Sequence, residues 1–442
     1  MRIDRRTGIV CVVRSLATRL SLAEWIVITI LALVLLSPFS CWRRGDDEGV
    51  TVKLWFFGLP GDAELIEKAL VEYRRRRPDV RVVMSTLPGK GYLQKLLPAM
   101  QANAAGDVVF LHWSMVAEVA AKQALLSLGE LVAADAYDID DLFEGSTLPY
   151  TYDGQLYAMP FRGSTMVLFY NRDLFDAAGL RYPDDEWTRE DFLAAAKRLT
   201  IREDGRVVQI GCMPDEPTSW VYSAGGTYAS DDLSELRFTD PRTLDGLRFY
   251  VELRTRHGVT ASNMDADGAD PTAVNVFEAG NVAMLISGPW ELGTFAHIDD
   301  FRWDVALFPK GPAGRHTRYA GVGFGVWSGT KVPGEAWELV KFLCGRDAGR
   351  VFRNAPTDVP ARRSVAESPE FLKPDEYVWD MGAFLRAMNP QHTTLRTFPR
   401  SNRWMEVRRH LTSKLDEVLI NGRDLGEAMA ELEDEVAALL AN

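Results

Sequence analysis

Regular spacing of apolar residues predicts alternating strands and helices after residue 49. Every second residue across 50–56 is apolar, which is typical of a strand with one buried face. Across 62–78 the apolar residues recur at helical spacing until a proline ends the pattern. A strand at 80–84, a helix around 93–100 and a continuous apolar run at 107–111 follow. This order, ending in a run typical of a parallel strand, predicts an α/β lobe.

Turn and capping signals predict further elements along the rest of the chain. The turn dipeptide Asp153-Gly154 lies between two aromatic-rich arms and predicts a hairpin. Thr188 and Asp191 have the spacing of a capping box, which predicts a helix start. The other expected elements are a strand at 166–171, a helix from Pro241, and two C-terminal helices at 402–421 and 424–441.

The segment 284–292 places a tryptophan where a buried strand ends. The apolar run is followed by Ser287-Gly288-Pro289 and at once by Trp290. A core tryptophan is usually held on the packing face of a helix or strand. A tryptophan on a Gly-Pro turn can instead present a flat apolar face and an indole N–H to a ligand. Trp290 is therefore the first candidate for a ligand-binding residue.

Length and charge limit the possible organisation and partners. A chain of 442 residues is too long for a single core, so two or three lobes are expected. Residues 1–49 hold seven arginines and five acidic residues and so carry a formal charge of +2. The whole chain carries −12, so residues 50–442 carry −14. Such an acidic body argues against a nucleic-acid partner, because phosphate binding needs a basic surface.

The first 49 residues have the features of a membrane-targeting segment. Trp25–Trp42 is an eighteen-residue stretch without a charge, preceded by five arginines. That length is near the lower limit for a membrane-spanning helix. The arginines predict a signal anchor with a cytoplasmic N-terminus and an extracytoplasmic body. The alternative is an export signal that is removed near Cys41, with a lipid attached to that cysteine.

The two cysteines of the body, Cys212 and Cys344, belong to no CxxC pair. Two buried free thiols are the favoured interpretation, and a disulfide between them stays open at this point. The chain therefore does not have the pattern of a disulfide-stapled scaffold.

No motif of the sequence indicates catalysis, a metal or a cofactor. The six histidines stand alone, and neither a G-x-S-x-G nor a phosphate-loop motif is present. The glycine-rich stretch 321–325 is not followed by a helix start, so close backbone approach is preferred over dinucleotide binding. Carboxylate pairs for sugar hydrolysis meet only in space and cannot be chosen from the sequence.

Several stretches, in order, resemble one protein family. They include V-T-V-K-L-W-F-F-G (50–58), D-G-Q-L-Y-A-M-P (153–160), L-F-Y-N-R-D-L-F-D-A-A-G-L (168–180) and F-E-A-G-N-V-A-M-L-I-S-G-P-W (277–290). The chain is similar to the extracellular solute-binding proteins, family 1, of carbohydrate ABC importers. The resemblance covers about residues 50–350 well and the C-terminal quarter loosely.

The resemblance implies a type II-like periplasmic-binding-protein fold. In that fold two α/β lobes are joined by strands that cross between them, and the lobes close on a ligand about this hinge. One lobe would comprise residues 50–162 and 319–353, and the other 163–318 and 354–442. The N-terminal transmembrane helix, within residues 1–49, would precede them.

The same resemblance implies a set of ligand-binding residues. A sugar needs aromatic plates for its apolar face and directed polar groups for its hydroxyls. In this family the tryptophan of G-P-W stacks on the ligand, which selects Trp290. The other positions implied are Trp404, Trp113 with Ser114, Trp220 with Tyr222, Arg162 as a charged donor near the hinge, and Gly321 and Gly323 at a crossover.

The expected function is that of a membrane-tethered receptor. It would bind a mono- or oligosaccharide and present it to an ABC permease, without catalysis. The identity of the sugar is open, because the turn Gly58-Leu59-Pro60-Gly61 lacks the acidic and basic pair used for maltose in this family. The alternatives are a glycerol phosphodiester or peptide as ligand, a sugar-sensing receptor subunit, and an extracytoplasmic glycoside hydrolase or lyase.

Overall fold

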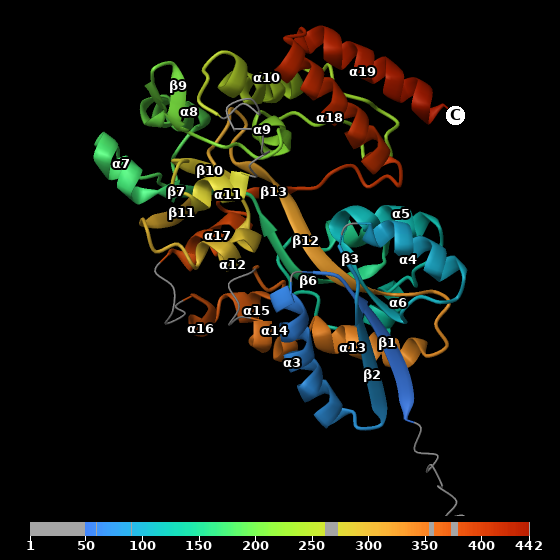
Figure 1. Ribbon diagram of the computed structural model, residues 1–442. Helices are drawn as coiled ribbons and strands as arrows, with labels where there is room; N and C mark the ends of the chain where they lie inside the picture. Colours follow the sequence, from blue (N-terminus) through green and yellow to red (C-terminus); the bar gives the residue numbers. More distant parts are fainter. Residues whose placement is uncertain are drawn as a thin grey trace, which may run out of the picture. The chain divides into compact units, whose positions relative to one another are not determined.

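The computed structural model describes residues 49–441 apart from 59, 90, 261–272, 353–357 and 373–378. The chain contacts separate an N-terminal unit, Met1–Thr51, from a second unit, Val52–Asn442. Apart from the first two residues of β1, the elements and the candidate site belong to the second unit (Figure 1). Within the described residues, no helix has the length and apolarity to cross a bilayer. The predicted span Trp25–Trp42 lies outside them.

A large sheet is built mainly from the N-terminal part of the second unit. Its strand order is β13-β12-β3-β1-β2, and β6 pairs with β12. The pair β1 and β3 is parallel, as the strand-helix-strand pattern predicted, and β12 runs antiparallel to β3. Its strands are β1 (Val50–Phe56), β2 (Val80–Thr86), β3 (Val108–His112), β6 (Ala158–Thr165), β12 (His316–Val326) and β13 (Thr394–Arg396).

A second, smaller sheet has the order β10-β7-β11 and is antiparallel throughout. Its strands are β7 (Val167–Asn171), β10 (Met284–Ser287) and β11 (Trp303–Leu307). β7 is buried along its whole length, which explains its unbroken apolar run. Loop segments extend the sheet through single parallel bridges, from Ile210 to Val282 and from Met213 to Leu285.

β6 and β12 connect the two sheets. β6 ends at Thr165 and continues directly into β7, while β12 pairs with β6 from Tyr319 to Gly325 (Figure 1). Close backbone approach at the glycine-rich stretch is confirmed, because a Cβ on Gly323 would lie 2.5 Å from the Met159 carbonyl oxygen. A Cβ on Gly321 would lie 2.8 Å from the Arg162 carbonyl oxygen. Both glycines are therefore packed against β6, and their assignment as ligand contacts stays a prediction.

The remaining elements surround these sheets. The helices are α3 (Pro60–Arg76), α4 (Tyr92–Gln101), α5 (Val116–Ala121), α6 (Gly129–Ala134), α7 (Arg172–Ala178), α8 (Arg189–Leu199), α9 (Thr218–Ser223), α10 (Pro241–Thr255), α11 (Ala273–Glu278), α12 (Leu292–Phe295), α13 (Pro333–Leu343), α14 (Arg346–Phe352), α15 (Arg363–Ala366), α16 (Pro369–Leu372), α17 (Met381–Met388), α18 (Trp404–Asn421) and α19 (Leu425–Leu440). Short 3-10 turns are η1 (Trp113–Met115), η2 (Leu148–Tyr150) and η3 (Pro289–Glu291), and two hairpins are β4 (Thr151–Tyr152) with β5 (Gln155–Leu156) and β8 (Ile201–Glu203) with β9 (Arg206–Gln209).

The local signals act as the sequence predicted. The Thr188 side chain accepts from the Asp191 backbone N–H, and the Asp191 carboxylate accepts in return from the Thr188 backbone, which begins α8. In the β4–β5 hairpin, Asp153 and Gly154 both have positive φ, at 46° and 71°. α18 begins at Trp404, two residues later than expected, and ends at the left-handed Gly422.

Both body cysteines are free and buried, which confirms the favoured interpretation. Cys212 packs in the core beside the small sheet with Phe192 and Phe308, and Cys344 packs in the core of the large sheet with Trp337. Burial raises the pKa of the Cys344 thiol to about 12. Neither thiol is therefore set up for redox chemistry.

Candidate ligand-binding site

The carboxyl ends of the parallel strands β1 and β3 lead to residues of interest. β1 leads to Asp62 in the first turn of α3, and β3 leads through His112 to Trp113 and Ser114 in η1. In open α/β sheets, ligands bind in the crevice outside these carboxyl ends. This edge of the large sheet is where a ligand is expected.

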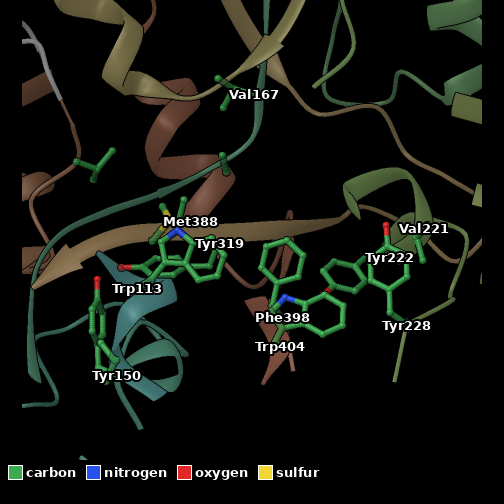
Figure 2. Packing of buried hydrophobic residues seen from close by; sticks show 14 of the residues in the cluster. Trp113, Tyr150, Val167, Val221, Tyr222, Tyr228, Tyr319, Met388, Phe398 and Trp404 are labelled. Atoms are coloured by element: carbon green, nitrogen blue, oxygen red, sulfur yellow. The ribbon is translucent and has the colours of Figure 1, made fainter. Parts of the chain in front are cut away.

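A stack of aromatic rings joins this edge to the C-terminal helices. The Trp113 ring lies parallel to Phe398, with centroids 5.0 Å apart and planes 19° apart. Phe398 also lies 5.4 Å from Trp404, which stacks on Tyr228 at 5.8 Å. Figure 2 shows Phe398 beside both tryptophans. The structure therefore brings the predicted Trp113 and Trp404 together, through a phenylalanine that sequence reasoning missed.

Two indole N–H groups of this stack have no partner within the described structure. Nε1 of Trp113 and Nε1 of Trp404 are both buried without a hydrogen bond. A buried donor without an acceptor costs about 1–3 kcal/mol. Both tryptophans line a small cavity of about 30 Å³. Aromatic rings beside a cavity are typical of sugar sites, because a sugar ring has an apolar face and a hydroxyl rim.

A buried arginine network lies beside the stack. Arg318 of β12 is 3.3 Å from the Asp215 carboxylate and also contacts Glu216, which Arg408 of α18 meets at 2.5 Å. The Arg318 guanidinium lies 5.7 Å from the centroids of both Trp113 and Phe398. Burial raises the pKa of Asp215, and the charge of Arg318 opposes that rise. No sequence motif pointed to this network.

Ser114 lies next to Trp113 and is held by a neutral histidine. His112 Nδ1 and Ser114 Oγ are 2.7 Å apart. Burial lowers the pKa of His112 to about 3, and the charge of Arg318 adds to the effect. The imidazole is therefore uncharged at physiological pH. Ser114 also lines a groove of about 810 Å³ between α4 and α18, which is wide enough for a ligand to enter.

Trp290 is half-buried in η3, directly after β10. Its ring covers Gly288, where a Cβ would lie 2.1 Å from a ring carbon. The next residue, Glu291, accepts a hydrogen bond from Ser287 Oγ at 2.9 Å. Burial raises the pKa of Glu291, and the charge of Asp215 raises it further, so these two carboxyl groups are neighbours. Trp290 is thus partly exposed, and its side chain hydrogen-bonds to the Glu291 carboxyl group.

Trp220 and Tyr222 differ from the sequence expectation. Trp220 is 1% exposed, and its ring packs between Phe249 at 4.7 Å and Phe308 at 4.6 Å in the core beside the small sheet. Tyr222 is also buried, and its hydroxyl donates to the Thr397 carbonyl at 2.8 Å. The structure therefore assigns Trp220 to core packing and Tyr222 to holding the segment before Phe398.

Arg162 is also not a free donor. Its guanidinium is buried and lies 2.9 Å from the Asp62 carboxylate. Asp358 lies close to this pair, since the charges of Arg162 and Asp62 both act on it. Burial raises the pKa of Asp358 to about 7, and Arg162 opposes the rise. Arg162 therefore compensates two carboxyl groups at the crossover of β6.

The raised pKa of Asp358 gives a pH-dependent stability with a defined sign. The folded state holds this proton more tightly than the unfolded chain, whose pKa is near 3.8. Its contribution is therefore full at low pH and is lost as pH rises from about 3.8 to about 7. We expect Asp358→Asn to remove this loss, so that the variant gains on the wild type between pH 4.5 and pH 8 in urea unfolding. An equal difference in unfolding free energy between Asp358→Asn and the wild type at pH 4.5 and at pH 8 would contradict the raised pKa of Asp358.

Comparison with known proteins places this geometry in a family. The family model for bacterial extracellular solute-binding proteins matches residues 59–349. The chain belongs to this family. Like other solute-binding proteins, it has an α/β fold of two lobes.

Individual relatives align with most of this chain. A binding protein of Brucella abortus (strain 2308) is 25% identical over 391 residues, covering 85% of this chain and 88% of the relative. A maltotriose-binding protein of Pyrococcus abyssi is 21% identical over 403 residues, covering 87% and 81%. A solved ABC substrate-binding protein of Listeria monocytogenes, in complex with cycloalternan, has a TM-score of 0.77 at 23% identity and covers 89% of this chain and 100% of that chain.

Proposed function

We propose that this solute-binding protein is the substrate-binding component of a carbohydrate ABC importer. It takes up a mono- or oligosaccharide between its two lobes and delivers it to a permease. Support comes first from Trp113 and Trp404. Both line a cavity, and their indole N–H groups lack an acceptor. A relative binds maltotriose, and a structural neighbour holds cycloalternan, so sugars are ligands in this family.

The proposed lobes are those that the family resemblance implies. One lobe comprises residues 50–162 and 319–353, and the other 163–318 and 354–442. β6 and β12 are the proposed hinge, because β6 leads directly into β7 of the smaller sheet and β12 pairs with β6. Trp113 belongs to the first lobe, whereas Trp290, Phe398 and Trp404 belong to the second. Closure of the hinge brings these aromatic groups to the same ligand.

The charge beside the aromatic stack favours a neutral sugar over a phosphate ester. The arginines nearest the aromatic stack, Arg318 and Arg408, are already paired with Asp215 and Glu216. A phosphate-bearing ligand needs basic groups whose charge is not already compensated. The ligand-binding residues we propose are therefore Trp290, Trp404, Trp113 and Ser114.

The first 49 residues are proposed to tether the receptor to the membrane. Trp25–Trp42 would act as an uncleaved signal anchor, with the body on the extracytoplasmic side. Mass spectrometry of the native N-terminus checks this directly. A species that begins at a lipid-modified Cys41 would overturn the anchor.

Uptake in the native host distinguishes an importer from a sensor. We expect deletion of the gene to abolish uptake of the radiolabelled sugar that the purified protein binds, and a plasmid copy to restore it. Uptake that continues unchanged in the deletion strain, with loss of a transcriptional or chemotactic response, would show a sensor subunit instead.

A further inference from the structure

The ring of Trp113, a candidate sugar plate, is covered by another ring of the same chain. Phe398 lies on it in a nearly parallel plane, with centroids 5.0 Å apart and planes 19° apart (Figure 2). Trp113 is only 7% exposed and Phe398 only 3%. The cavity that Trp113 lines, of about 30 Å³, has room for roughly two waters. A sugar ring therefore cannot stack on Trp113 while Phe398 stays in this position.

Phe398 is held by groups of the second proposed lobe. The Tyr222 hydroxyl donates to the carbonyl of the preceding residue, Thr397, at 2.8 Å. The ring of Trp404 lies 5.4 Å from the Phe398 ring, and the Arg408 guanidinium lies 5.2 Å from its centroid. All of these groups lie in the same proposed lobe as Phe398, so we expect the phenyl ring to move with that lobe.

Trp113 is held by the first proposed lobe. It begins η1 directly after β3, and the His112 side chain accepts from the Ser114 backbone N–H. The His112 ring also lies 5.0 Å from the Trp113 ring. The stack of Trp113 on Phe398 therefore crosses from one proposed lobe to the other, and opening of the hinge separates the two rings.

Arg318 adds a second contact to Trp113. Its guanidinium lies 5.7 Å from the centroid of Trp113 and 5.7 Å from that of Phe398. It is fixed in place by Asp215 and Glu216. The attraction between a cation and an aromatic ring grows where water is excluded, as it is at these buried rings. Contacts within the chain itself thus favour closed lobes.

One feature of Trp113 opposes this closed arrangement. Its indole N–H is buried, and within the described structure it has no acceptor. A buried donor without an acceptor is unfavourable, and opening of the lobes returns the donor to water. The stack is therefore a contact that can be released.

We infer that the stack of Phe398 on Trp113 is a latch between the lobes, and that Phe398 competes with the sugar for the ring of Trp113. This inference rests on the proposed function. In the latched state Trp113 is covered, so only the unlatched fraction of the receptor binds sugar. The apparent affinity is lowered by that fraction. Phe398 therefore weakens sugar binding, whereas a residue that stacks on the ligand strengthens it.

The direction of the affinity change in Phe398→Ala tests the inference. Removing the phenyl ring frees Trp113, and we expect sugar to bind about three- to tenfold more tightly. Calorimetric titration of the full chain measures the change. The probes are the mono- to tetrasaccharides of the malto-, manno-, arabino- and galacto-oligosaccharide series.

Phe249→Ala is the matched control. The Phe249 ring also packs on a tryptophan, Trp220, at 4.7 Å, and also lies beside a guanidinium, that of Arg189, at 5.3 Å. These three residues all belong to the second proposed lobe. We expect Phe249→Ala to lose stability but to bind sugar as the wild type does.

A distance between the lobes gives a second readout. Gln101 of α4 and Ser413 of α18 are exposed, and these two helices line the groove of about 810 Å³. Spin labels are attached to Gln101→Cys and Ser413→Cys after Cys11→Ser and Cys41→Ser, because the two body thiols are buried. We expect one short distance in the ligand-free wild type, and an added longer distance in Phe398→Ala.

Three results would overturn one of the two proposals. A long distance in the ligand-free wild type that shortens with sugar would overturn the latch, even if Phe398→Ala does not fold. A folded Phe398→Ala with unchanged or weaker sugar affinity would also overturn it, and would leave the proposed function intact. A wild type and a Phe398→Ala variant that both bind none of the four series would overturn the proposed function itself.

Discussion

Replacing Arg318 with methionine is expected to lower the free energy of unfolding by about 3–5 kcal/mol, the usual cost of removing one partner of a buried ion pair. Arg318 is 8% exposed and faces both Asp215 and Glu216. Methionine fills a similar volume but leaves the two carboxylates with less compensation. Urea unfolding at neutral pH, followed by circular dichroism, measures the change.

Arg302→Met is the matched control for this variant. Arg302 pairs with Asp173 and Asp176, but its side chain is 60% exposed. Exposed ion pairs contribute about 0–1 kcal/mol, so the control should remain close to the wild type. The deficit of Arg318→Met should also shrink at acid pH, because a protonated Asp215 no longer needs the arginine. Equal losses for the two variants would contradict the buried network.

Trp290→Ala is expected to weaken sugar binding by at least about thirtyfold, which corresponds to about 2 kcal/mol and is the range of an interface hot spot. Trp290 is partly exposed, and its side chain hydrogen-bonds to Glu291, whose pKa the charge of Asp215 raises. Removing the indole deletes the apolar plate for the sugar ring. The polar groups that bind the hydroxyls remain, so the loss should be seen in affinity rather than in the fold.

Trp187→Ala serves as the control for Trp290→Ala. Trp187 is likewise half-buried, but it packs near Phe175 and hydrogen-bonds through its backbone to Lys310, apart from the aromatic stack. We expect it to bind sugar as the wild type does, at a comparable cost in stability. Calorimetry at a single temperature compares the three proteins. Equal affinities for all of them would remove Trp290 from the site.

The strands and helices of the fold were predictable because they depend on local patterns. The alternation at 50–56, the capping box at Thr188 and the Asp153-Gly154 turn each set their element through residues a few positions apart. The smaller sheet was less predictable, because its antiparallel pairing of β7 with β10 and β11 joins segments more than 100 residues apart.

The candidate site was only partly predictable for the same physical reason. Trp113 and Trp404 were predicted and lie in one aromatic stack, but Phe398 between them has no signal of its own, since a single phenylalanine in a loop forms no pattern. Arg318 and Asp215 are 103 positions apart, so their pairing exists only in the folded chain. Trp220 was assigned to the ligand because an aromatic on a six-residue helix does not reveal which face is buried.

A ligand screen on the full chain tests the central claim most directly, with tryptophan fluorescence and Tm read together. A ligand at a hundred times its Kd adds about 2.7 kcal/mol to the stability of the folded state, which is a visible shift in Tm. The account predicts that at least one mono- or oligosaccharide shifts both signals, and that Trp290→Ala loses the response while remaining folded. A broad sugar panel without effect, together with a shift by a glycerol phosphodiester or a peptide, would contradict it.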